Sequence, residues 1–104
     1  MLIAFSVAPS VAADETGSVG DAVARAIQIV RDSGLPHRTD AMFTTIEGEW
    51  DECMALVKRC CDTLAESAPR VALVLKADIR PGRSGELDGK LERLEAAIHA
   101  QAER

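Results

Sequence analysis

Hydrophobic positions along the chain follow two different spacings, and these spacings predict the order of secondary-structure elements. Residues 2–8 are a nearly continuous apolar run, which is typical of a buried strand. Apolar residues then recur at helical spacing from 19 to 30, Ser18 and Asp21 form a capping-box pattern at the start of this helix, and Gly34 is expected to end it. Further along, the pattern predicts strands at 37–41, 43–47 and 71–79, a helix at 49–66, and a C-terminal helix with an apolar stripe of Leu87, Leu91, Leu94 and Ile98.

This order of elements, βαββαβ followed by one helix, predicts an α+β fold of the ferredoxin-like kind over a single domain, residues 1–104. Such a fold is an antiparallel sheet with its helices on one face. The strands at 2–8 and 71–79 are nevertheless apolar on both faces, whereas an antiparallel strand with one wet face should alternate. We therefore expect the second face of the sheet to be buried against another subunit, in a symmetric homo-oligomer.

Composition excludes several classes of partner. The formal charge of −5 argues against nucleic acid, because binding phosphates requires a basic face. The first thirteen residues lack the basic start and the length of a signal peptide, so we interpret them as the beginning of the first strand. No stretch reaches the roughly 18 apolar residues needed to span a bilayer, so the sequence predicts a soluble, cytoplasmic protein without a membrane partner.

Three cysteines fall within the predicted helix at 49–66. At 100° per residue, Cys53, Cys60 and Cys61 share a face with Trp50, and we expect the thiols to act as small buried hydrophobic groups. A disulfide within one straight helix is excluded for Cys53 and Cys60, since seven residues separate their Cα atoms by about 10.5 Å. No metal-binding cysteine spacing is present.

Polar residues inside the predicted strands mark the candidate site. They are Ser6 in the first strand, Thr44, Thr45 and Glu47 around 43–47, with Asp40 just before, and Lys76 and Asp78 in the last strand. A polar group buried in a sheet needs a partner. One interpretation is that these residues satisfy one another, for example Lys76 with Glu47 or Asp78. The other is that they line a pocket for a small molecule, which would be cationic or carry an amide-like edge.

Several segments together resemble one small family. They are Ala-Phe-Ser-Val-Ala-Pro at 4–9, the run from Ser33 to Met42, Thr-Thr-Ile-Glu-Gly-Glu-Trp-Asp at 44–51, Pro-Arg-Val at 69–71 and Lys-Ala-Asp-Ile-Arg at 76–80. This combination is similar to the YkoF-like thiamine-binding proteins, up to about residue 83. The family usually has Pro-Leu-Gly where this chain has Pro-Ser-Val at 9–11.

The resemblance implies a non-catalytic protein that binds thiamine or its hydroxymethylpyrimidine moiety, with no further cofactor, and a tetramer built from dimers. Carboxylates suit the amino group of the pyrimidine and the positive thiazolium, and an aromatic ring such as Phe43 or Trp50 can provide a cation–π face. We predict Glu47 and Asp40 as the main hydrogen-bond acceptors, with Ser6, Thr44 and Thr45 as secondary contacts.

The residues are also compatible with two other classes of function. One is a metal-dependent enzyme, with oxygen ligands from residues such as His37, Asp40, Glu47, Glu49 and Asp51, although their spacing matches no known metal motif. No nucleophile with a plausible base was found, so no catalytic residue is predicted. The other class is a structural or regulatory oligomer without a ligand. Arg80, Gly82 and Arg83 form either a solvated basic turn or a phosphate contact.

Overall fold

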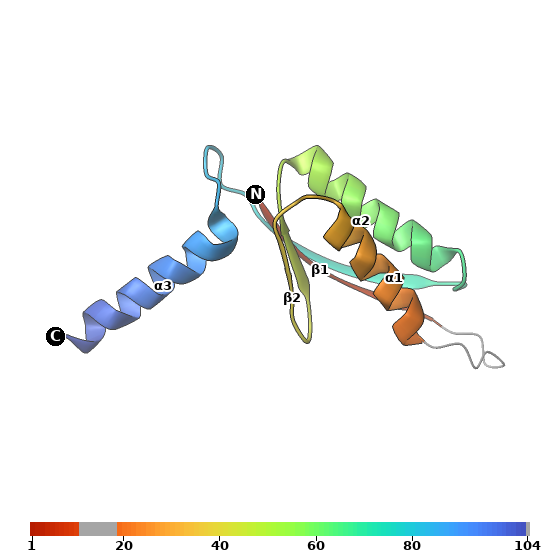
Figure 1. Cartoon of the computed structure of the whole chain (residues 1–104), viewed down its shortest axis with the longest axis horizontal. Coiled ribbons are helices and arrows are strands. Elements are labelled where there is room, and N and C mark those ends of the chain that lie inside the picture. Colours follow the sequence, from red (N-terminus) through yellow and green to blue (C-terminus); the bar gives the residue numbers. More distant parts are fainter. Residues whose placement is uncertain (11–18, 104) are drawn as a thin grey trace.

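The chain folds into a four-stranded antiparallel sheet with two helices on one face and a third helix that leaves the body of the molecule (Figure 1). The computed structural model describes residues 1–10 and 19–103. The elements are β1 (Leu2–Pro9), α1 (Val19–Asp32), β2 (His37–Thr39), β3 (Thr44–Glu47), α2 (Trp50–Ala65), β4 (Val71–Asp78) and α3 (Glu86–Ala102). The strand order β2-β3-β1-β4 and the βαββαβα sequence of elements confirm the predicted fold class. Ser18, the predicted cap of α1, lies outside the described residues.

The hydrophobic core lies between the sheet and the helices α1 and α2. Ile3, Phe5 and Ile46 from the strands are buried against residues of both helices, which include Ala26, Val30, Cys53, Leu56, Val57, Cys60 and Leu64. Alternation along the strands explains this set, because successive side chains point to opposite faces of a sheet. No described helix is long and apolar enough to cross a membrane.

The opposite face of the sheet has no helix over it within the part of the chain described, apart from the first turn of α3. The strand register places Ala4 beside Lys76 and Ser6 beside Val74 on this face. Thr45 and Arg38 continue the same row onto β3 and β2. We call this surface the open sheet face; its residues on β1 and β4 are Leu2, Ala4, Ser6, Ala8, Ala72, Val74, Lys76 and Asp78.

The hairpin between β2 and β3 is confirmed, but its predicted boundaries were wrong. The strand expected at 37–41 ends at Thr39, and the next begins at Thr44 rather than at 43. Asp40 causes the difference: its backbone N–H donates to the carbonyl of Phe43 at 3.0 Å, and its side chain binds two further amides of the turn. The chain therefore needs four residues, not one, to reverse direction.

The start of α2 also differs from the prediction. The helix begins at Trp50, and Glu49 is its N-cap, where Glu49 and Glu52 form a capping box. Trp50 was expected on the buried face with the cysteines, but its side chain is 52% exposed. In the first turn of a helix, a residue can project beyond the end of the sheet, so the helical period alone does not decide its burial.

The three cysteine thiols differ in burial, and this difference predicts different reactivities. Cys53 and Cys60 are buried and Cys61 is half-buried. Burial raises the pKa of the Cys60 thiol to about 11, and the Cys60 Sγ donates to the Ala26 carbonyl at 3.5 Å. At pH 8, a thiol reagent should modify native Cys61 well before the other two, because the thiolate is the reactive form and access limits its attack. Cys61→Ser should remove this early reaction, whereas rapid modification of Cys60 in the native protein would contradict the structure.

Candidate functional site

A small pocket lies between α1, β1 and the β2–β3 hairpin. Its volume is about 210 Å³, and apolar side chains from the strands and from α1 form much of its wall. The polar residues at its edge come from the hairpin. The lining residues are Phe5, Ser6, Val7, Val23, Ile27, Thr39, Asp40, Ala41, Met42, Phe43 and Thr44. We call it the hairpin pocket; it brings together Ser6, Asp40 and Thr44 of the five predicted site residues.

Asp40 combines a structural contact with a free acceptor. Its Oδ1 accepts the backbone N–H groups of Met42 at 3.0 Å and Phe43 at 3.1 Å, which fixes the side chain on the turn. These hydrogen bonds hold the pKa of Asp40 below its ordinary value, and the bond from Phe43 has the larger effect. The carboxylate therefore stays charged at neutral pH. Within the described part of the chain, Oδ2 has no hydrogen-bond partner, so this oxygen can accept a hydrogen bond from a ligand.

Two hydroxyl groups meet on the pocket side of the hairpin. Thr44 Oγ1 lies 3.1 Å from Thr39 Oγ1, and Thr44 is buried while Thr39 is exposed. One hydroxyl must donate to the other, which leaves the hydrogen of the second hydroxyl for another acceptor. The pair therefore offers both a donor and an acceptor to a bound molecule. The sequence analysis did not include Thr39 among the site residues. A signal was present, because Asp40 is a typical first residue of a tight turn, and the two residues that flank such a turn face each other across the hairpin.

Ser6 and Thr45 were predicted to contact the ligand together with the other three residues, but their side chains lie toward the other face of the sheet. Ser6 borders the hairpin pocket, but its alternation with Phe5 and Val7 places its side chain toward the open sheet face. Thr45 pairs with Ala4 and Arg38 on that same open face, so it lies across the sheet from Thr44.

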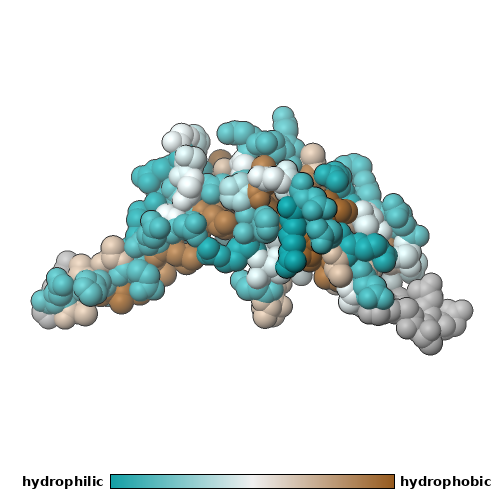
Figure 2. Space-filling view, viewed as in Figure 1, coloured by the Kyte–Doolittle hydropathy of each residue, from teal (hydrophilic) through white to brown (hydrophobic). Residues whose placement is uncertain are grey.

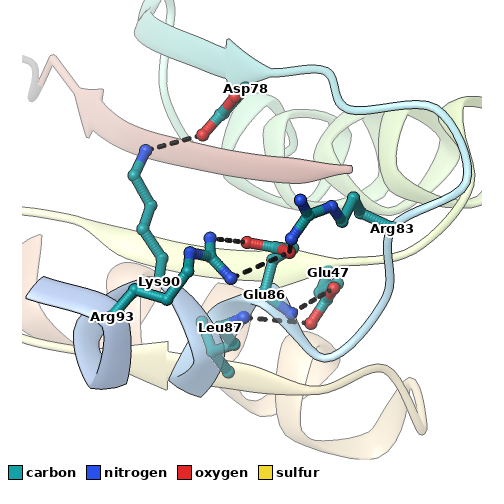
Figure 3. Close-up of polar contacts among 7 residues, drawn as sticks. All are labelled: Glu47, Asp78, Arg83, Glu86, Leu87, Lys90 and Arg93. Carbon is teal, nitrogen blue, oxygen red and sulfur yellow. Dashed lines mark hydrogen bonds and ion pairs between the residues drawn. The ribbon is translucent and has the colours of Figure 1, made fainter. Parts of the chain in front are cut away.

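Glu47 is separated from the hairpin pocket and binds the start of α3 (Figure 3). Its carboxylate accepts the backbone N–H of Glu86 at 2.8 Å and that of Leu87 at 3.1 Å. Only 7% of Glu47 is exposed. The first amides of a helix have no partner within it, so a carboxylate from another element can satisfy them and complement the helix dipole. Gly85, with φ of 67°, turns the chain just before this cap.

Lys76 was one possible structural partner for Glu47 or Asp78, but among the described residues neither carboxylate forms an ion pair with it. Asp78 instead binds Lys90 of α3, with Oδ2 and Nζ 2.6 Å apart (Figure 3). Side-chain hydrogen bonding by Lys90 holds the pKa of Asp78 below its ordinary value. These contacts join residues far apart in the sequence, so only the path of α3 relative to the sheet reveals them.

A second pocket lies beside Glu47, between the start of α2 and the start of α3. Its volume is about 450 Å³, and Glu47, Glu49 and Glu52 contribute carboxylates to its wall, with Arg83 on the loop before α3. Each of these carboxylates already serves a helix start: Glu47 accepts amides of α3, and Glu49 and Glu52 form the capping box of α2. The hairpin pocket, with the free oxygen of Asp40, is therefore the better candidate for a ligand.

The basic loop before α3 and the possible metal ligands lie away from the hairpin pocket or do not form a site. Arg80, Gly82 and Arg83 lie with Trp50 around a third pocket of about 240 Å³, away from the hairpin. Of the two rings predicted to face the ligand, Phe43 lines the hairpin pocket and Trp50 does not. Arg83 lies 3.7 Å from Glu86, which also binds Arg93 at 2.5 Å. Among residues 1–10 and 19–103, no three His, Cys, Asp or Glu side chains are grouped to hold a metal ion.

The fold and the pocket define a small ferredoxin-like domain with a partly apolar cavity whose polar edge is a β-hairpin. The chain belongs to the thiamine-binding protein family, whose family model matches residues 3–95. This result confirms the resemblance identified from the sequence.

Individual relatives agree with this assignment. The chain is 48% identical over 96 residues to the UPF0045 protein Mb1933 of Mycobacterium bovis, covering 91% of each chain. Among solved structures, a domain of unknown function from Bacillus cereus is 32% identical with a TM-score of 0.73, covering 82% of each chain. A Thermotoga maritima protein described as a putative thiamine biosynthesis/salvage protein is 30% identical with a TM-score of 0.68, covering 84% of this chain and 91% of that one.

Proposed function

We propose that this protein binds thiamine, or the hydroxymethylpyrimidine part of it, in the hairpin pocket without transforming it. The observation that carries the proposal is the pocket's combination of an ionised carboxylate with a free oxygen and a pair of hydroxyls beside apolar walls. Family membership and the description of the Thermotoga maritima relative support thiamine as the ligand.

The pyrimidine ring fits the chemistry of the hairpin. Its exocyclic amino group is a donor, and Asp40 Oδ2 is the free acceptor on the turn. Its ring nitrogens accept hydrogen bonds, and the hydroxyl pair of Thr39 and Thr44 keeps one hydrogen to donate. Phe43, which is half-buried, supplies apolar area for a ring face. A volume of about 210 Å³ suits one aromatic ring with its substituents, so we place the thiazolium nearer the opening, where Asp40 favours its positive charge.

A thermal-shift comparison tests this function. A ligand that binds only the native state raises the unfolding free energy by RT ln(1 + [L]/Kd), about 2.7 kcal/mol at a hundredfold excess over Kd. For a domain of this size, that corresponds to a rise of roughly 10 °C in Tm. We expect this rise with thiamine and hydroxymethylpyrimidine and none with divalent metal ions.

Chromatography of the ligand after incubation with the protein completes the test. Thiamine should be recovered unchanged, as expected for a binding protein. A product peak that grows with protein concentration would replace the proposal with a catalytic function. Thermal stabilisation by a metal ion alone would favour the metal-dependent alternative, and no stabilisation by any of these compounds would favour an oligomer without a ligand.

A further inference from the structure

The loop between β4 and α3 places two arginine residues next to each other at the surface. Residues 80–83 form a tight turn, in which the backbone N–H of Arg83 donates to the carbonyl of Arg80 at 3.1 Å. Pro81 at the second position and Gly82 at the third, with φ of 77°, are the residues that a type II turn favours. The first and last Cα atoms of such a turn are less than about 7 Å apart, so both guanidinium groups can reach one small ligand.

Neither arginine forms a strong ion pair within the described part of the chain. Arg80 has no ion-pair partner there. Arg83 lies 3.7 Å from Glu86 Oε1, but Arg93 binds both oxygens of the same carboxylate (Figure 3). Glu86 therefore keeps a positive partner if Arg83 turns toward a ligand. Two neighbouring cations also repel each other, and a bound anion would remove this repulsion.

The third pocket, beside this turn, has an apolar and aromatic wall. Its volume is about 240 Å³, and Trp50 and Ile79 line it together with the turn. Trp50 is 52% exposed and Ile79 is 58% exposed, so apolar surface lies open to water next to the two arginines. The turn stands at the end of the molecule where β1 begins (Figure 1), and hydrophobic residues are exposed at the surface beside it (Figure 2).

The charge of this pocket favours an anion. Glu49 is the carboxylate that borders it, and its side chain accepts the backbone N–H of Glu52 in the capping box of α2. The charged side chains of the wall are therefore two guanidinium groups and one carboxylate that an amide already engages. A concave site with this balance attracts a negatively charged ligand.

We propose that this pocket, which we call the arginine pocket, binds a phosphate monoester whose alcohol part carries a flat ring. Guanidinium groups present planar sets of N–H donors that match phosphate oxygens, and two of them balance its nearly double charge. The ring packs on the indole of Trp50, where aromatic contact stabilises it. The arginine pocket shares no lining residue with the hairpin pocket, so this site is separate from the proposed thiamine site and goes beyond the proposed function.

Fluorescence of Trp50 reports on this pocket directly, because it is the only tryptophan of the chain. Phenyl phosphate is the probe, and phenol is the control that lacks the phosphate. We expect phenyl phosphate to quench the emission in a saturable manner, at concentrations at which phenol leaves it unchanged. Absence of quenching by phenyl phosphate, or equal quenching by phenol, would overturn the proposal.

Calorimetry on variants tests the two arginines. Arg80→Gln and Arg83→Gln should each weaken phenyl phosphate binding by about tenfold or more, because each removes charged donors from the phosphate. Arg59→Gln, at an exposed position of α2 that lines none of the three pockets, is the matched control and should bind as the wild type does. Equal losses in all three variants would show long-range electrostatics in place of a site and would overturn the proposal.

The ring contact and the independence of the two pockets are tested in the same way. Trp50→Leu keeps an apolar side chain but removes the indole, so phenyl phosphate should bind about two- to tenfold more weakly, and inorganic phosphate should bind as before. Asp40→Asn should leave both affinities unchanged, whether or not the hairpin pocket binds thiamine. Unchanged phenyl phosphate binding in Trp50→Leu, or its loss in Asp40→Asn, would overturn the proposal. The substituted side chains are exposed, so the fold should survive.

Discussion

Asp40→Asn should weaken thiamine binding by roughly ten- to a hundredfold. The substitution keeps an oxygen at the Oδ1 position, which can still accept the amides of Met42 and Phe43, so the turn should survive. It replaces the free Oδ2 by an amide nitrogen, which is a donor and cannot accept from the pyrimidine amino group. A charged hydrogen bond is roughly twice as strong as one between neutral groups, so its loss should raise Kd by about one to two orders of magnitude.

Titration calorimetry measures this effect, with Asp51→Asn as the control. Asp51 is exposed in the first turn of α2 and lines neither the hairpin pocket nor the pocket beside Glu47, so its removal changes the net charge by the same amount without touching the proposed site. Equal loss of affinity in both variants would reduce the role of Asp40 to long-range electrostatics. Unchanged affinity in Asp40→Asn would remove Asp40 from the site.

The affinity difference between wild type and Asp40→Asn should also depend on pH. The turn amides lower the pKa of Asp40, so the carboxylate is protonated only below the ordinary aspartate range, which centres at about 3.9. The difference should therefore be constant from about pH 8 to about pH 5 and disappear in stronger acid. The stability of the fold should depend on pH in the same direction. The contribution of these hydrogen bonds to the unfolding free energy is complete above the pKa of Asp40 in the unfolded chain, and it is lost as the pH falls through the pKa of Asp40 in the folded protein.

Glu47→Ala should release α3 from the sheet and lower the unfolding free energy by about 2 kcal/mol. The substitution leaves the first amides of α3 without their charged acceptor, which combines a lost helix cap with lost charged hydrogen bonds. For a domain of this size, Tm should fall by roughly 10 °C. Because Glu47 lies outside the hairpin pocket, thiamine affinity should change little.

The milder Glu47→Gln and an exposed carboxylate of α3, Glu92→Gln, complete the series. The glutamine side chain at position 47 would retain one acceptor oxygen, so the fall in stability should be intermediate, and Glu92→Gln should behave as wild type. Circular dichroism melts and calorimetry on the same samples separate the two roles of Glu47. A large loss of thiamine affinity with unchanged stability would restore the sequence-based prediction that Glu47 contacts the ligand.

The fold class and the order of the elements could be predicted from the sequence, because these depend on periodicity. A period near 3.6 groups the apolar residues of α2 on one side, which the structure buries, whereas a period of two only divides the strand at 2–8 into two apolar faces, and the structure decides that the face of Ile3 and Phe5 is the covered one. The sequence also located most of the polar residues at the hairpin, since Asp40 and Thr44 are close in the chain. The signal for an uncovered second sheet face was present as well.

The division of the polar residues among separate sites depended on the tertiary structure. Ser6, Asp40 and Thr44 border one pocket, Thr45 lies on the open sheet face, and Glu47 binds the start of a helix 39 residues later in the chain. The partner of Glu47 depends on where α3 begins in space, and Gly85 and the loop before it set that position. Contacts between residues so distant in sequence leave no periodic signal, so a strand carboxylate that caps a helix has the same local pattern as one that binds a ligand.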